Sequence, residues 1–396
     1  MNSKETLMSN QQVRRSLTAD EADAFGRELD SLRLEVQADL GERDVAHMRR
    51  VVRLAQRAEA GGRALLGFGL DPVTFVAGSL LLGTSKILEN MEIGHNVMHG
   101  QYDWTRDPEL GAHAYDWDNV CAASDWRHSH NVEHHTFTNI VGKDRDVGYG
   151  FLRITDAQPW NPTHLVQPLS ASFLALFFQW GVALHDLRID ESLRGDQPLG
   201  VLLRRARPFA RKATRQIAKD YLLFPMLTFW NAPRVFAGNL IANGIRNVWT
   251  FGIIFCGHFP DGVQMYSEEE THTESRGRWY LRQLNGSANL EGGRTFHILT
   301  GHLSHQIEHH LFPDLPAARY PEMAPRVREI CRRYGQAYNT GSFRRQMGSV
   351  IARLVRHAVP GTVGVFAPAG RSRVSGPPMA ESIRADPAPH QRTSAP

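Results

Sequence analysis

Apolar residues are concentrated in the middle of the chain, between two polar ends. The first strongly apolar segment covers residues 73–88, and others follow at 165–184, 221–230 and 235–256. The first is a little short of the roughly 20 residues that a helix needs to cross a bilayer. The pattern predicts an all-α helical bundle in a membrane, and Pro233 allows the last two segments to form a tight helical hairpin.

Two helix starts are marked by local sequence. A helix rich in Arg and Glu is predicted over about residues 19–62, with Thr18 or Asp20 as its N-cap. Asp71 and Pro72 predict a second start just before the first apolar segment, because proline is tolerated in a first helical turn.

The two ends are predicted to lie outside the folded domain. Residues 1–20 are polar and are expected to be disordered, and residues 366–396, rich in Pro, Ala, Ser and Arg, are expected to form a disordered tail. The folded domain is therefore predicted to cover residues 21–345. No apolar stretch follows Met1, so no cleavable signal peptide is expected.

Composition and charge add to this picture. Hydrophobic residues make up 42% of the 396 residues, and the mean hydropathy of −0.36 is low for a polytopic membrane protein. The net charge is +4, and basic residues crowd the segment 188–219. No nucleic-acid-binding motif is present, so we expect no nucleic acid partner. Next to apolar segments, the positive-inside rule predicts a cytoplasmic loop for this basic segment, and a solvated helix face is the alternative.

The last apolar segment contains a polar stripe. Asn239, Asn243, Arg246 and Asn247 recur about every four residues. Because polar residues in a membrane helix normally face the protein interior, we expect this stripe to be buried.

Histidine is concentrated in three short clusters. They are His95-Asn-Val-Met-His99, His130-Asn-Val-Glu-His134-His135 and His305-Gln-Ile-Glu-His309-His310. Neutral imidazole is the commonest protein metal ligand, and eight imidazoles are too many for one zinc ion, which takes four ligands. Residues four apart share a helix face, so His95 and His99 can bind one ion. Neighbours such as His134 and His135 diverge by about 100° and can each serve a different ion.

These clusters and their surroundings resemble the membrane fatty acid desaturase family, and most closely its actinobacterial acyl-CoA desaturases. The resemblance rests on segment 89–100 (Glu-Asn-Met-Glu-Ile-Gly-His-Asn-Val-Met-His-Gly), segment 130–139 (His-Asn-Val-Glu-His-His-Thr-Phe-Thr-Asn) with the following 144–150, and segment 306–316 (Gln-Ile-Glu-His-His-Leu-Phe-Pro-Asp-Leu-Pro). It extends from about residue 45 to residue 340.

The resemblance implies two non-haem iron ions in a cap on the cytoplasmic side of the membrane bundle. There they activate O2 and remove two hydrogens from an unactivated acyl chain. The implied iron ligands are His95, His99, His130, His134, His135, His309 and His310. His258 occupies the place of an additional ligand. In the third cluster relatives often have Gln where Gln306 stands; we favour His305 because it repeats the spacing of the second cluster.

Other residues near the clusters are expected to support the ligands. His302 stands where the resemblance leads us to expect Asn, as a supporting residue or a ligand. Glu133 and Glu308 lie inside the clusters and are expected either to orient imidazole rings or to be solvated.

The chain contains no recognisable electron-transfer cofactor site. Its three cysteines are far apart, which excludes a disulfide scaffold and a four-Cys iron–sulfur cluster. It has neither the His-Pro-Gly-Gly signature of a fused cytochrome b5 nor a Gly-x-Gly-x-x-Gly after a strand. We therefore expect electrons from a separate NAD(P)H reductase or ferredoxin, which would dock on the basic residues 204–219. The substrate is expected to be an acyl-CoA or a lipid-linked acyl chain.

Three other functions remain open. A membrane hydroxylase or monooxygenase would use the same diiron core. A soluble ferritin-like desaturase would use two Glu-x-x-His motifs, which Glu92 to His95 and Glu269 to His272 formally match. A non-enzymatic membrane metal-binding protein is the third, although metal-transport sites usually lie inside the spans.

Topology follows if all clusters lie on one face of the cell (inner) membrane. Segment 165–184 is then expected to lie in the interface, whereas 221–230 and 235–256 cross the bilayer. A re-entrant pair of helices between about residues 60 and 90, broken at 69–72, would keep the Arg-rich N-terminal helix on the cytoplasmic side.

Overall fold

The computed structural model describes residues 14–360, and this part of the chain is almost entirely helical. Its two strands, β1 (Asn289–Glu291) and β2 (Thr340–Ser342), pair in parallel with Leu290 opposite Gly341. The predicted helical architecture is therefore confirmed for the described residues.

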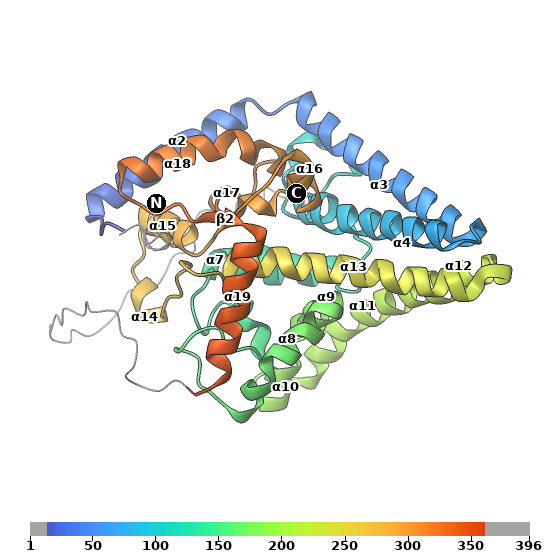
Figure 1. The fold of residues 1–396 in the computed structure, drawn as a ribbon. Coiled ribbons are helices and arrows are strands. Elements are labelled where there is room, and N and C mark those ends of the chain that lie inside the picture. The colour runs from blue at the N-terminus through green and yellow to red at the C-terminus, as the bar shows by residue number, and fades with distance from the viewer. Residues whose placement is uncertain (1–13, 361–396) are drawn as a thin grey trace, which may run out of the picture. The chain divides into compact units, whose positions relative to one another are not determined.

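The first large feature is a hairpin of α3 (Glu42–Phe68) and α4 (Pro72–Ile87), whose legs lie side by side (Figure 1). Asp71 caps α4 by accepting a hydrogen bond of 3.0 Å from a backbone N–H of the first turn, as predicted. The legs pack so closely that a Cβ at Gly62 would lie 2.8 Å from the backbone nitrogen of Leu82. The chain therefore turns back at residues 69–71, where the sequence predicts a break between re-entrant helices.

A second hairpin contains the basic segment. Its elements are α11 (Leu199–Ile217), the π-helix η6 (Ala218–Leu223), α12 (Phe224–Leu227), η7 (Phe229–Asn231) and α13 (Ala232–His258). The basic segment 188–219, expected as a cytoplasmic loop with a solvated helix face as the alternative, is mostly helical, because α11 covers most of it. Leu202, Ala206, Phe209 and Ala213 recur every three to four positions among the arginines and form a helical stripe. Phe209 and Ala213 pack in a buried cluster beneath this helix.

The turns of the two hairpins meet. The indole N–H of Trp230 donates a 3.0 Å hydrogen bond to the carbonyl of Gly67, and the side-chain amide of Asn231 donates one of 2.9 Å to the carbonyl of Gly69. Around this meeting point large apolar side chains are more than two-thirds exposed, namely those of Phe68, Leu70, Val73, Met226 and Phe229. Both hairpins thus end in a shared apolar tip.

The predicted polar stripe of α13 is buried. Asn243 donates a 3.1 Å hydrogen bond to the carboxylate of Asp220, and Asn247 donates one of 2.7 Å to the carbonyl of Leu176. Among the described residues, the helical stretch 229–258 is long and apolar enough by itself to cross a membrane.

Helices α8 (Gln167–Leu176) and α9 (Phe178–Asp186) cover the segment that the sequence places in the membrane interface. With the preceding η5 (Pro162–Val166) they pass the same test of length and composition as a pair, but they are bent by 98° at residue 177.

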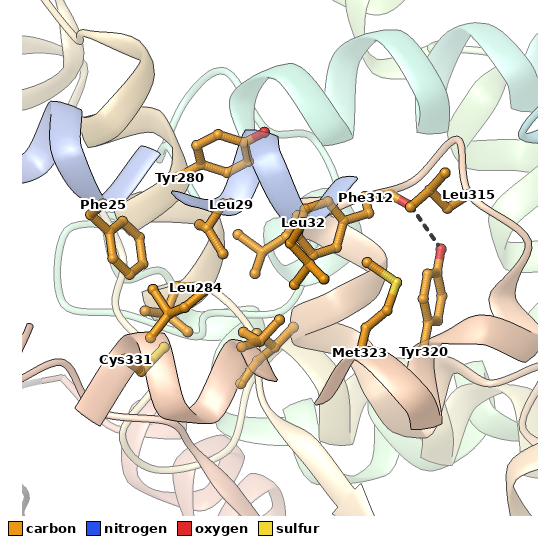
Figure 2. Packing of buried hydrophobic residues seen from close by; sticks show 14 of the residues in the cluster. Phe25, Leu29, Leu32, Tyr280, Leu284, Phe312, Leu315, Tyr320, Met323 and Cys331 are labelled. Atoms are coloured by element: carbon orange, nitrogen blue, oxygen red, sulfur yellow. Dashed lines mark hydrogen bonds between the residues drawn. The ribbon is translucent and has the colours of Figure 1, made fainter. Parts of the chain in front are cut away.

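The N-terminal helix α2 (Ala19–Ala38) is capped by Thr18, as predicted, and packs in a separate apolar core. Figure 2 shows this core, in which Phe25 and Leu29 of α2 lie against Leu284 of α15 (Arg276–Asn285) and Cys331 of α18 (Tyr320–Arg333). Further short helices of residues 268–319 are α14 (Glu268–Thr271), α16 (Arg294–Leu299), η8 (Leu303–His305) and η9 (Ala317–Arg319).

The folded part is longer than the predicted residues 21–345. Leu17 is buried, so part of the predicted disordered N-terminus belongs to the core. At the other end α19 (Phe343–Ala358) packs against α13 and α8. The predicted tail 366–396 lies outside the described residues. Short helices connect the larger elements: η2 (Asp103–Thr105), α6 (Ala123–Trp126), η4 (Val147–Gly150), η5 (Pro162–Val166) and α10 (Ile189–Arg194).

Candidate metal centre

Each histidine cluster lies on its own helical segment. The first spans the π-helix η1 (Leu88–His95) and α5 (Asn96–Met98), and the second spans the π-helix η3 (Arg127–His134) and α7 (His135–Phe137). The third lies on α17 (Gln306–Leu311). Single π-helical turns within α-helices are frequent at functional sites, because the wider turn re-aims side chains.

Four histidines form a first group. His95, His99, His130 and His309 each offer a ring nitrogen, and these four atoms lie within 4.8 Å of one another. The Nε2 atoms of His95 and His130 are 3.3 Å apart, and the rings of His95 and His99 have centroids 4.7 Å apart. The structure thus brings His95 and His99 to one site, as their spacing predicts.

A second group adjoins the first. His134, His258 and His310 offer ring nitrogens within 4.8 Å of one another, and the Nε2 atoms of His258 and His310 are 3.3 Å apart. His135 lies between the groups, because its Nε2 is 3.1 Å from that of His309 and its ring stacks on His310 at 4.5 Å. Neighbouring histidines of the second and third clusters therefore diverge towards different groups.

His305 does not join either group. It precedes α17 with φ −105° and ψ 56°, so the helical spacing that relates it to His309 in the sequence does not hold in the structure. Its ring lies instead against His297, with centroids 4.6 Å apart. Gln306 faces the second group, with its Nε2 2.9 Å from Nε2 of His258. The geometry thus corrects the preference for His305 over Gln306.

The two acidic residues inside the clusters have other partners. Glu133 pairs with Arg188, and Glu308 accepts hydrogen bonds of 2.8 Å from both Asn289 and Tyr338. Burial raises the pKa of Glu308 to about 7, although these two donors oppose the shift. Within residues 14–360 neither carboxylate is hydrogen-bonded to an imidazole of the two groups, so the orienting role expected of them is not observed.

Asp144 takes that role for His134. Both of its carboxylate oxygens lie 3.1 Å from Nδ1 of His134, and the backbone N–H of Asn139 donates a 2.7 Å hydrogen bond to one of them. Burial lowers the pKa of His134, but the charge and hydrogen bond of Asp144, together with the charge of Asp146, outweigh burial, so the pKa is raised. A carboxylate behind a metal-binding imidazole fixes its tautomer and orientation. Sequence reasoning missed this residue, although it opens the motif at 144–150.

The chemistry of the donor set fits metal binding. Burial, reinforced by neighbouring imidazoles, holds the pKa values of His99, His130, His135, His309 and His310 well below 6.5. These rings are therefore neutral at pH 7, which is the form that binds metal ions. In the described part of the chain, buried Nε2 of His99 has no hydrogen-bond partner. A buried polar atom without a partner is costly, and a metal ion between the rings would provide one.

A cavity adjoins both groups. Four of their histidines line it, namely His95, His130, His134 and His258. Its apolar walls are formed by Met91, Trp117, Phe178, Ile254, Phe259 and Leu303. The site is therefore a histidine-lined end of a largely apolar cavity.

Comparison with known proteins agrees with this arrangement. Residues 71–342 match the family described as Fatty acid desaturase. An NADPH-dependent stearoyl-CoA 9-desaturase of Mycobacterium tuberculosis is 43% identical over 348 residues, which are 87% of this chain and 82% of that protein. An acyl-lipid (7-3)-desaturase of Rebecca salina is 30% identical over 66% of this chain and 59% of its own length. An sn-1 linoleoyl-lipid 6-desaturase of Synechocystis sp. is 23% identical over 67% and 76%.

The family match covers all three histidine clusters and both hairpins apart from α3. By contrast, Glu269 and His272, which the ferritin-like alternative needs, belong to none of the groups that bring metal-binding side chains together in the described residues. The chain belongs to the fatty acid desaturase family.

Proposed function

We propose that this enzyme introduces a double bond into the acyl chain of an acyl-CoA, using O2 and two iron ions. One observation carries the proposal: eight imidazoles from four separate segments converge in two adjoining groups and His135 between them, and four of these imidazoles line a cavity with a largely apolar surface. The similarity to a protein named as a stearoyl-CoA desaturase supports acyl-CoA as the substrate class and the 9 position as the first to examine.

The two groups divide the ligands. His95, His99, His130 and His309 would hold one iron, and His134, His258 and His310 would hold the other, with His135 between them. Gln306 would contribute an amide to the second group, because it lies beside His258. When bound, the iron pair supplies the O2-activating chemistry that removes hydrogen from a saturated carbon chain.

The residues of the chain provide position and exclusion of water. An apolar acyl chain fits between the walls at Trp117, Phe178 and Phe259, with its reacting carbons next to His130 and His134. Holding one pair of methylenes against the oxidising centre lowers the entropic part of the barrier. The apolar lining also keeps water from the reacting carbons.

We further propose that the shared apolar tip of the two hairpins enters the cell membrane, with the histidine groups and the arginine-bearing part of α11 on the cytoplasmic side. The apolar side chains exposed at the shared hairpin tip support this, because in water such a patch would be unfavourable. Two hairpins give an even number of crossings, so both histidine-bearing ends lie on one face. Helix α13, at about 1.5 Å per residue, is long enough for the roughly 30 Å hydrocarbon layer.

An acidic reductase or ferredoxin is proposed to deliver electrons at α11. Arg204 and Arg207 are exposed on this helix, and no ion pair occupies them in the described structure. Reversing Arg204, Arg205 and Arg207 to Glu should slow electron transfer, and the loss should shrink as salt is added, because screening weakens the wild-type attraction. Stopped-flow reduction measures this, with Arg344→Glu on α19 as a control. Wild-type rates in the triple variant would exclude α11 as the docking site.

The main test is product analysis in a desaturase-deficient host that expresses this chain with a compatible reductase. A new unsaturated acyl chain is expected, and it should disappear in His135→Ala but persist in His113→Ala, whose side chain is exposed. An alcohol in place of the double bond would assign the chain to the monooxygenases. Iron binding without any oxidised product, across several acyl-CoA lengths and reductases, would contradict the proposal and leave a metal-binding protein.

A further inference from the structure

A separate set of metal-ligand side chains lies beside the first histidine cluster. One carboxylate oxygen of Glu92 is 2.9 Å from Nε2 of His47, and the other is 2.8 Å from Nδ1 of His302. Ligand atoms of all three residues lie within 4.8 Å of one another. We propose that Glu92, His47 and His302 form a third metal site, which binds one divalent first-row transition ion and shares no residue with the two histidine groups.

This combination of donor atoms is typical of sites for particular metal ions. Two imidazoles and one carboxylate bind zinc in several enzymes and bind non-haem iron(II) in others, with open positions left for water. The side chain of Glu92 is 1% exposed and that of His302 is 5% exposed. A buried carboxylate requires a compensating positive charge, and a divalent ion between the two imidazoles would provide it.

The backbone is shaped to bring these residues together. His302 has φ +56°, in the left-handed region that few non-glycine residues adopt. It follows Gly301, where a Cβ would lie only 2.3 Å from the carbonyl oxygen of Met91, so this turn is pressed against η1. Such conformations persist where the surrounding structure determines them, and they are concentrated at binding sites. Here the turn holds the imidazole of His302 against Glu92.

The third site would connect three distant parts of the chain. His47 lies on α3, Glu92 on η1 and His302 in the turn before η8. Glu92 stands three residues before His95, so an ion here would fix the segment that carries this ligand. The imidazole of His47 is 15% exposed, which gives an ion a path from solvent.

The experiment counts metal ions in the full-length protein, purified in detergent, stripped by chelation and dialysed against zinc. We expect wild type to bind one zinc ion more per chain than His302→Asn and one more than His47→Ala. Asn tolerates the left-handed backbone at position 302, and His47 is the most exposed of the three residues, so both variants are chosen to preserve the fold. His113→Ala, which changes an exposed histidine elsewhere, should match wild type.

A second reading uses cobalt, whose visible absorption reports ligand geometry. Titration of stripped wild type with cobalt should show a band that is absent in both variants, whereas the bands of the two histidine groups should be retained. Equal zinc counts in wild type and both variants would overturn the proposal and leave a metal-free His–Glu–His hydrogen-bonded triad. If His302→Asn loses all of its metal, the comparison of wild type with His47→Ala decides. Because the readout is a difference of one ion, it does not depend on desaturase activity.

Discussion

Two buried polar regions of this protein, the histidine groups and the surroundings of Lys86, adjoin cavities that share a wall, and they are built differently. Trp117 and Asn119 line both the cavity at the histidine groups and a second, polar cavity next to α11. Near this second cavity, Lys86 lies 2.8 Å from the carboxylate of Asp220 and 3.4 Å from that of Asp118. Opposite charges there neutralise one another.

The histidine groups show the reverse pattern. Here imidazole nitrogens face other imidazole nitrogens: the Nε2 atoms of His135 and His309 are 3.1 Å apart, and those of His95 and His130 are 3.3 Å apart. Neighbouring imidazoles do not neutralise one another's polar atoms. Without a bound ion, apolar side chains would therefore be more stable than these buried rings. The charges beside the second cavity therefore match one another without an ion, whereas the histidine groups hold an excess of one kind of donor, as a bound metal ion requires.

The largest effect is expected at His309, a member of the first group that also lies 3.1 Å from His135. Replacing His309 by Ala should lower iron content and reduce desaturation by about 100-fold or more, because losing a ligand costs more than losing its outer partner. His305→Ala is the matched control, since His305 lies outside both groups, and it should retain activity within a few-fold. Equal losses in the two variants, measured by iron analysis and product formation, would contradict the assignment.

In the region around Lys86, Asp220→Asn should lower the free energy of unfolding. It leaves the buried ammonium group of Lys86 without its nearest partner, and breaking such a pair costs about 3–5 kcal/mol. Denaturant unfolding in detergent should show this loss, whereas folded protein should still bind iron. The exposed pair at Asp196 provides the control, for which Asp196→Asn should change stability by less than about 0.5 kcal/mol. Iron loss from folded Asp220→Asn would contradict the distinction between a structural region and a metal-binding region.

A milder substitution should distinguish a metal ligand from the residue that orients it. Asp144→Asn keeps the shape of the side chain that orients His134 but removes its charge, so metal affinity or activity should fall by about 10- to 100-fold. Competition with a chelator measures the affinity. Asp261→Asn, at an exposed position, should leave it unchanged. An affinity equal to wild type in Asp144→Asn would mean that Asp144 does not support a ligand.

The smallest expected effect is on pH dependence. Protons compete with a metal ion only when the pH falls below the pKa of the ligand, and the pKa values of His130, His135, His309 and His310 lie well below 6.5. Iron held by the first group should therefore stay constant from about pH 8 to about pH 6, whereas the raised pKa of His134 lets protons compete earlier at the second group. Loss of both iron ions near pH 6.5, in dialysis followed by iron analysis, would show that the first group titrates like exposed histidines.

Local sequence predicted much of this site because its signals are local. The spacing of His95 and His99 and the divergence of His134 from His135 follow from helix geometry alone. The start of α4 at Asp71 and the burial of Asn243 also follow from short patterns.

The remaining features depend on where helices begin and on distant contacts. His305 has the right spacing but precedes α17, so its ring does not share the helical face of His309. Asp144 reaches His134 through a turn of the chain, and Gln306 is distinguished only by its approach to His258. Helix α11 was obscured by its arginines, which resemble a basic loop until the apolar positions between them are read at helical spacing.

X-ray absorption at the iron edge of the purified enzyme would show whether imidazole rings of this chain hold the iron. A first shell dominated by imidazole nitrogen, with the multiple-scattering pattern of histidine rings, is the predicted result. That signal should fall in His309→Ala and remain in His305→Ala. A first shell of carboxylate oxygen, or a protein that binds no iron at all, would contradict the account.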